Sequence, residues 1–239
     1  MTEAELQKEI EAEALAKPGN ADEYKMDDVQ ADPDSKIRGK KIIFLGSSVT
    51  VGYASFNESF VHYTAKKCGI EYILEAISGT TLVDTPRNGN DSYVTRMKGI
   101  DKSYPADLFL CQLSTNDATN KKPLGEIAEG FDKEKFDVLT ITGAMEYVIA
   151  YARETWGCKV AFYTGTKYGS PEYEAMVARL LELKEKWGID VLDLWNDPEM
   201  NAVSKSDYDL YMFDPIHPCK AGYKLWWGPK FVKFFEEIL

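Results

Sequence analysis

Near its C-terminus the chain carries an aspartate and a histidine at a spacing suited to proton transfer. Asp214 stands three residues before His217, one of only two histidines in the sequence. A carboxylate in this position can accept one imidazole N–H, which fixes the tautomer and leaves the other ring nitrogen free to act as a base. The alternative is an ordinary surface turn, because Asp-Pro commonly begins one. The second histidine, His62, lies in an apolar run and is expected in the core or on a helix face.

A serine near the other end of the chain could supply the nucleophile for such a base. Ser48 follows Gly46 and Ser47 directly after a short apolar run. A serine hydroxyl is a weak nucleophile unless a base takes its proton, and His217 would be that base. Two alternatives stay open for this segment: a plain strand-to-helix connection with a capping hydroxyl, or a phosphate cradle. The cradle is disfavoured, because the loop lacks the Gly-Lys-Ser/Thr and Gly-x-Gly-x-x-Gly patterns.

Gly79 and Asn116 are two further residues that could contact a reacting group. Each follows a predicted strand, and each could be no more than a turn residue. A glycine also lets a backbone N–H approach a substrate without a side chain in the way. An asparagine side chain can donate to a developing oxyanion. Both residues are therefore candidate oxyanion donors.

The elements that must position these residues alternate between strands and helices. Apolar runs predict strands at 42–45, 71–76, 107–113, 159–164 and 189–194. Helical spacing predicts helices at 57–68, 141–156, 171–187 and 221–239, with a further helix at 3–17. This alternation indicates an α/β fold with a parallel sheet and helices on both faces. Working groups in such sheets lie in loops beyond the carboxyl ends of the strands, where all of the candidates fall.

The four blocks together resemble the SGNH (GDSL-type) hydrolases from about Lys41 to the end of the chain. The blocks run in the order Gly-x-Ser, Gly, Asn-Asp and Asp-x-x-His. The resemblance implies a flavodoxin-like three-layer α/β/α sandwich with a five-stranded parallel sheet. It also implies no metal or organic cofactor, and family members are esterases, lipases, thioesterases and carbohydrate deacylases.

The resemblance assigns a role to each matching residue. Ser48 would be the nucleophile, and Asp214 and His217 would complete a catalytic triad. The oxyanion hole would consist of the backbone N–H groups of Ser48 and Gly79 and the side chain of Asn116. No Gly-x-Ser-x-Gly elbow of the α/β-hydrolase type is present.

Two positions depart from the usual family pattern. Ser47 replaces the aspartate of the usual Gly-Asp-Ser block, and Ser114 stands where the third block usually begins with glycine. Neither position carries proton transfer or an oxyanion contact, so activity is expected to survive. The support of the nucleophile loop is the part that these changes put in question.

Composition restricts the domain organisation and the partners. A chain of 239 residues suits one large domain, here 39–239 as the hydrolase domain, with an N-terminal arm over 1–38 that is partly helical or disordered. The net charge of −11 argues against nucleic acid or anionic membrane as a partner. The acidic N-terminus lacks a signal-peptide pattern, so a cytoplasmic protein is expected. The scattered cysteines predict free thiols and no zinc site; they are Cys68, Cys111, Cys158 and Cys219.

The expected activity is that of a serine esterase or acylhydrolase on a small-molecule ester. The favoured substrate is a small-acyl ester, with an acetylated carbohydrate preferred, and Tyr53, Tyr168 and Trp195 are candidate aromatic residues of the pocket rim. Arylesterase, thioesterase and lysophospholipase-type activities are the alternatives within the family. A non-catalytic binding module and a phosphate- or flavin-binding protein are the alternatives outside it. A homo-oligomer is compatible with the sequence.

Overall fold

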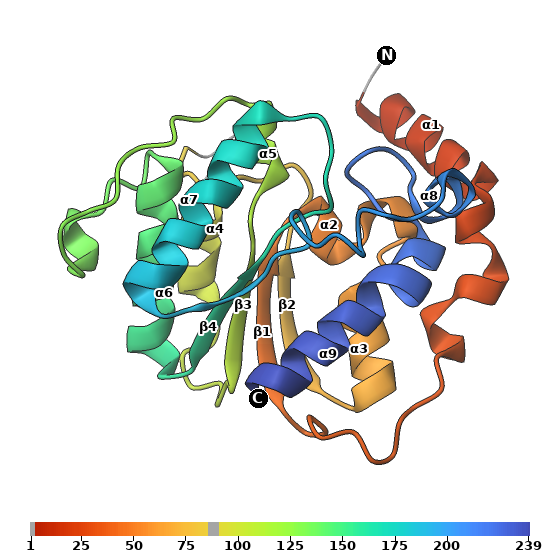
Figure 1. The fold of residues 1–239 in the computed structure, drawn as a ribbon, viewed down its shortest axis with the longest axis horizontal. Helices are drawn as coiled ribbons and strands as arrows, with labels where there is room; N and C mark the ends of the chain where they lie inside the picture. The colour runs from red at the N-terminus through yellow and green to blue at the C-terminus, as the bar shows by residue number, and fades with distance from the viewer. Residues whose placement is uncertain (1–2, 86–90) are drawn as a thin grey trace.

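The fold is built on a parallel sheet of five strands (Figure 1). The computed structural model describes residues 3–85 and 91–239. The strand order is β2-β1-β3-β4-β5. The strands are β1 (Lys41–Gly46), β2 (Glu71–Ala76), β3 (Leu108–Gln112), β4 (Lys159–Tyr163) and β5 (Asp190–Leu192). The predicted α/β fold with a five-stranded parallel sheet is therefore confirmed, although β5 is shorter than expected.

Helices cover both faces of the sheet, so that the fold has three layers (Figure 1). One face packs against α4 (Tyr93–Arg96), α6 (Ile141–Trp156) and α7 (Pro171–Trp187). The other packs against α3 (Phe60–Cys68) and α9 (Gly228–Ile238). Strands β1 and β3 are buried almost throughout, because helices shield them on both sides.

Two predicted helices differ from the observed ones for local reasons. The helix expected from residue 57 begins at Phe60, because Ser59 caps it and His62 accepts the Ser59 N–H in a capping box. His62 therefore lies on a helix and supports its first turn. The closing helix is divided into a π-helical turn over Gly222–Trp227 and the α-helix α9.

Within the described residues, the loops beyond the carboxyl ends of β1, β3 and β5 each carry a short helix. These are α2 (Ser48–Val51) after β1, α5 (Thr115–Thr119) after β3, and α8 (Lys205–Tyr211) in the connection after β5. In the sheet, Gly46 of β1 pairs with Ala76 of β2, so these two strands end at the same level. The segments that follow them therefore meet at one edge.

The chain before β1 runs along the α3 and α9 side of the molecule (Figure 1). It begins with α1 (Glu3–Ala16) and continues with 3-10 turns at Pro18–Asn20, Asp22–Tyr24 and Met26–Asp28. Helix α1 contacts the 3-10 turn Tyr53–Ser55, which follows α2. The segment before β1 thus contains a helix where one was predicted. The division into an arm and a domain near residue 38 stays a prediction.

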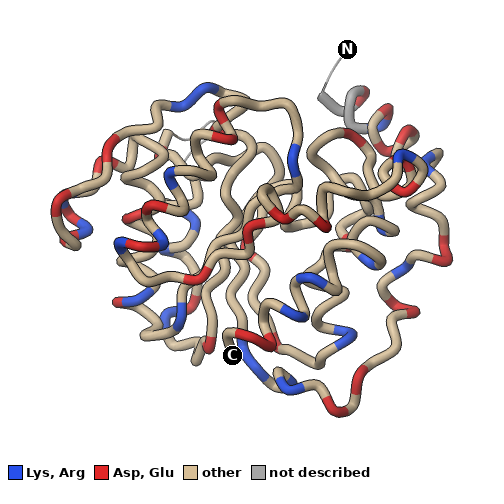
Figure 2. The backbone as a smooth tube through the Cα atoms, viewed as in Figure 1, with Lys and Arg blue, Asp and Glu red and all other residues tan. Residues whose placement is uncertain are grey.

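Charged residues of both signs are interspersed along the described chain (Figure 2). Within residues 3–85 and 91–239, the search for a helix long and apolar enough to cross a bilayer finds none.

Candidate active site

Ser48 is presented by a tight turn between β1 and α2. Gly46 is required there, because a Cβ atom on it would lie 1.8 Å from Thr50 Oγ1. The turn is held by Gln112, whose Oε1 accepts from the Ser47 N–H at 2.9 Å and from the Thr50 hydroxyl at 2.6 Å. The Ser48 residue is 5% exposed. A glycine and a buried amide thus fix the position of the hydroxyl.

The structure brings Ser48, His217 and Asp214 into one line of hydrogen bonds. His217 Nε2 lies 2.8 Å from Ser48 Oγ, and His217 Nδ1 lies 2.7 Å from Asp214 Oδ2. An ionised carboxylate can only accept, so Nδ1 carries the proton and the Ser48 hydroxyl donates to Nε2. The contact between Ser48 and His217 joins residues that are 169 positions apart in sequence.

Asp214 is held in place by its own loop. Its Oδ1 atom accepts the backbone N–H of Ile216 at 2.8 Å and that of His217 at 2.9 Å. Burial alone would raise the pKa of Asp214, but the His217 contact and these two N–H groups outweigh it and hold the pKa below the ordinary carboxyl value. Asp214 is therefore ionised at neutral pH and fixes the orientation of the imidazole.

Asn116 links the loops that follow three neighbouring strands. Its Nδ2 donates to the Thr80 carbonyl at 2.9 Å and to Ser47 Oγ at 3.2 Å. Thr80 follows Gly79, whose φ of +79° lies in the left-handed region that favours glycine. Asn116 thus contacts the sequence neighbours of Ser48 and Gly79. Ser114, the second departure from the family pattern, caps α5 and accepts the Asp117 N–H.

Two supporting residues were missed in the sequence. Arg96 donates from Nη2 to the Gly46 carbonyl at 2.8 Å and from Nη1 to the Glu75 carboxylate at 2.8 Å, so it ties the ends of β1 and β2 together. Asp117 is fully buried and accepts the backbone N–H groups of Leu82 and Val83. Asp117 belongs to the Asn-Asp block, which could have indicated its role, whereas no sequence pattern indicates a role for Arg96.

A small cavity is lined by sequence neighbours of the predicted site residues, although Ser48, Asn116 and His217 do not line it themselves. Val49, Thr115 and Ile216, which line it, are the sequence neighbours of Ser48, Asn116 and His217, and its volume is about 10 Å³. Its other walls are formed by the ends of β3 and β4 and the segments that follow β4, namely Gln112, Tyr163, Gly165, Thr166, Tyr168 and Tyr173. A space of this size accommodates little more than a methyl group.

A larger, polar cavity of about 340 Å³ lies on the Gly79 side. Its described walls also include the side chains of Thr80, Thr81, Thr85, Asp91, Asn120 and Lys122. The polar segment after Asn116 thus borders a cavity. Among the described lining residues, every side chain is polar.

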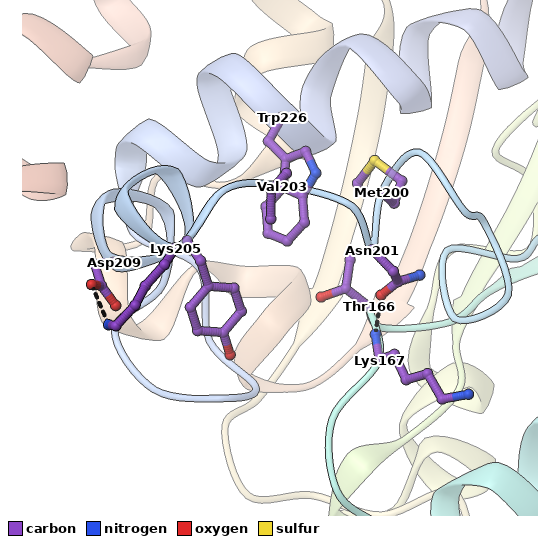
Figure 3. Close-up of a pocket in the computed structure, with 9 residues that line it drawn as sticks. Thr166, Lys167, Met200, Asn201, Val203, Lys205, Asp209 and Trp226 are labelled. Atoms are coloured by element: carbon purple, nitrogen blue, oxygen red, sulfur yellow. Dashed lines mark hydrogen bonds and ion pairs between the residues drawn. The ribbon is translucent and has the colours of Figure 1, made fainter.

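A third cavity, of about 420 Å³, is bounded by Thr166 and Lys167 after β4, by the segment after β5 and by Trp226 (Figure 3). None of the predicted site residues lines it.

The three predicted rim aromatics have different positions. The Tyr53 ring lies 5.9 Å from the His217 ring, and Tyr168 lines the small cavity. Trp195 is not at a rim: it is 2% exposed and packs against Tyr168 and Tyr173. Within the described ranges, no group of three or more His, Cys, Asp or Glu side chains could hold a metal ion.

Comparison with known proteins identifies the family. The model of the GDSL-like lipase/acylhydrolase family matches residues 44–225, and the chain belongs to this family of hydrolases. The predicted resemblance and fold are therefore confirmed. A search among curated proteins finds no match.

Solved structures of similar fold include three from bacteria. A protein from Lactobacillus plantarum is 20% identical with a TM-score of 0.64, over 84% of this chain and 97% of that one. A GDSL-like lipase candidate from Bacteroides ovatus is 21% identical with a TM-score of 0.60, over 83% and 99%. A family two carbohydrate esterase from Clostridium thermocellum, in complex with cellohexaose, is 16% identical with a TM-score of 0.59, over 83% and 64%. At these identities the likeness is one of fold.

Proposed function

We propose that the protein is a serine esterase that hydrolyses a carboxylic ester through Ser48, His217 and Asp214. The observation that carries this proposal is the continuous line of hydrogen bonds, 2.8 Å from Ser48 to His217 and 2.7 Å from His217 to Asp214. Both distances suit proton transfer without rearrangement. Membership of a hydrolase family supports it.

The reaction would proceed through an acyl-enzyme. His217 Nε2 takes the Ser48 proton while Oγ forms a bond to the ester carbonyl carbon, and the imidazolium is stabilised by Asp214. His217 then gives the proton to the leaving alcohol as the C–O bond breaks. Water then gives a proton to the same imidazole and adds to the acyl carbon. The bond between this carbon and Ser48 Oγ breaks, Oγ takes the proton back from His217, and the carboxylic acid leaves.

The developing oxyanion would be bound by the Ser48 and Gly79 N–H groups and by Asn116. An amide nitrogen has two hydrogens, and Asn116 uses one of them on the Thr80 carbonyl at 2.9 Å. Its second hydrogen makes the longer contact of 3.2 Å with Ser47. A substrate oxyanion would compete with the Ser47 hydroxyl for this hydrogen, because a charged acceptor forms the stronger hydrogen bond.

The substrate that suits these surroundings is a small-acyl ester of a polar alcohol. The cavity of about 10 Å³ bordered by Ile216 favours an acetyl group over longer chains. The polar cavity beside Gly79 would receive a hydroxyl-rich alcohol such as a sugar. The similarity in fold to a carbohydrate esterase is consistent with this preference.

The test is hydrolysis of p-nitrophenyl acetate and of acetylated sugars by the wild type and by Ser48→Ala. We expect the wild type to release acetate from both kinds of substrate and Ser48→Ala to give background rates, with unchanged circular dichroism. Equal rates for the two proteins would exclude Ser48 as the nucleophile. Background rates for both would favour a binding module instead. Long-chain esters complete the panel and distinguish an acetylesterase from a lysophospholipase-type enzyme.

A further inference from the structure

The chain before β1 packs against the loop that carries His217. Gly19 lies directly on the end of α8, where an added Cβ atom would be 1.9 Å from the Leu210 carbonyl oxygen. Lys17 Nζ lies 5.4 Å from the centre of the Phe213 ring. This segment is outside residues 44–225, which the family model covers. It is therefore a feature of this chain that the family match does not explain.

One side chain in this segment bonds to both catalytic loops. Asn20 is 6% exposed, and its Oδ1 accepts the Lys220 N–H at 2.9 Å. Its Nδ2 donates to the Ala54 carbonyl at 2.8 Å and to the Ala14 carbonyl at 2.8 Å. Ala54 belongs to the turn after α2, which begins with Ser48, and Lys220 lies three residues after His217. Asn20 thus bridges the nucleophile loop and the base loop.

A second link between the same loops passes through Glu58. Its Oε1 forms an ion pair with Lys220 Nζ at 2.8 Å, and its Oε2 accepts the Met26 N–H at 2.6 Å. The Lys220 side chain is 7% exposed and the Glu58 side chain 25%, so the contact is partly shielded from water. Met26, like Asn20, belongs to the segment before β1. Two bridges from that segment therefore converge on Lys220.

We propose that Asn20 and Glu58, through their bonds to Lys220, are positioning residues that hold His217 at hydrogen-bond distance from Ser48. The inference rests on the proposed function. His217 lies outside the sheet, in the connection between α8 and the π-helical turn, and α2 has only four residues. The 2.8 Å distance between Ser48 Oγ and His217 Nε2 thus depends on contacts between the loops. A misplacement of about 1 Å can cost about a hundredfold in rate.

The test compares Asn20→Ala with a matched control, Asn201→Ala, in the full chain. Asn201 makes bonds of the same kind: Nδ2 donates to the Leu194 and Trp195 carbonyls, and Oδ1 accepts the Lys167 N–H. We expect Asn20→Ala to lower kcat for p-nitrophenyl acetate on the order of tenfold, with KM within about twofold. Asn201→Ala should lower the melting temperature and leave kcat within about twofold of the wild type. Assays are run well below both melting temperatures.

A gentler variant decides the matter if Asn20→Ala does not fold. Glu58→Gln keeps an acceptor for the Met26 N–H and removes the charge that faces Lys220, and it should lower kcat about threefold. Wild-type kcat and KM in the folded variants, with only the melting temperature lowered, would overturn the positioning role. Ser48→Ala is assayed alongside. Undiminished activity of Ser48→Ala would refute the proposed function, whereas an inactive Ser48→Ala with a fully active Asn20→Ala would refute the positioning role alone.

Discussion

The Nδ2 atom of Asn116 lies 3.2 Å from the Oγ atom of Ser47, the residue that replaces the aspartate usual in this family. The hydroxyl thus joins the nucleophile loop to the proposed oxyanion donor without a buried charge. Ser47 is fully buried, and its Oγ also lies 3.4 Å from Gln112 Oε1. A carboxylate there would face that amide oxygen. A neutral serine at position 47 therefore suits a site that faces the Gln112 oxygen better than an aspartate would.

Removal of the Asn116 amide should slow the chemical step. For Asn116→Ala we expect kcat to fall on the order of a hundredfold with little change in KM, because an oxyanion donor lowers the barrier by about 3 kcal/mol. Steady-state kinetics on p-nitrophenyl acetate measures this, and the exposed Asn196→Ala is the control. An unchanged kcat would remove Asn116 from the oxyanion role.

Replacement of Gln112 should destabilise the fold. Gln112→Leu keeps a similar volume but takes away the acceptor of the Ser47 N–H and the Thr50 hydroxyl. The buried Ser47 N–H is left unpaired, whereas Thr50 Oγ1 keeps its contact with the Tyr163 hydroxyl at 2.6 Å. The free energy of unfolding is therefore expected to fall by about 2 kcal/mol. Urea unfolding followed by fluorescence tests this. A loss of unfolding free energy below about 0.5 kcal/mol is within the range of neutral surface substitutions. It would show that the loop does not depend on Gln112.

Asp214 should make stability dependent on pH in the acid range. Its pKa is lowered in the folded state relative to the ordinary value of 3.8. Its contribution is therefore fully present above about pH 4 and is lost as the pH falls through the lower folded value. Melting temperatures of the wild type and Asp214→Asn between pH 2 and pH 7 measure the difference, which should narrow as the pH falls. A melting-temperature difference that stays constant from pH 2 to pH 7 would contradict the lowered pKa of Asp214.

A wider cavity beside Ile216 should admit longer acyl groups. Tyr168 lines the cavity of about 10 Å³, and Tyr168→Ala would extend it. We expect the ratio of kcat/KM for p-nitrophenyl butyrate to that for the acetate to rise about tenfold, since each methylene in a fitted pocket is worth about 1–3 kcal/mol. Tyr147→Ala, on α6, serves as the control. If the ratio stays constant, the acyl group binds elsewhere.

The edge of the sheet on which the site lies could be predicted from the sequence. Ser48 and Asn116 each follow a buried apolar strand, and parallel strands place their carboxyl ends together. The spacing between Asp214 and His217 similarly suits one local turn, whose hydrogen bonds the structure contains. The direction of the strands and the spacing within one turn were sufficient to predict where these residues lie.

The contacts made through backbone carbonyls could not be predicted in this way. Arg96 bonds to the carbonyls of Gly46 and Glu75, and every residue type offers such an acceptor. Asn20 binds the backbone of residues distant in sequence for the same reason. Trp195 was placed at a rim because the residue type alone does not distinguish an aromatic cluster in the core from a pocket wall.

The bond between Asn20 and Lys220 joins two segments that are 200 positions apart in sequence. In a chain emerging from the ribosome, the five strands would be released before the proposed base His217. Closing so long a loop costs more conformational entropy than forming a local helix and is therefore slower. During refolding from urea, esterase activity should therefore return after the helical circular dichroism signal. The return of activity would report that the segment around Asn20 has docked on the loop that carries His217.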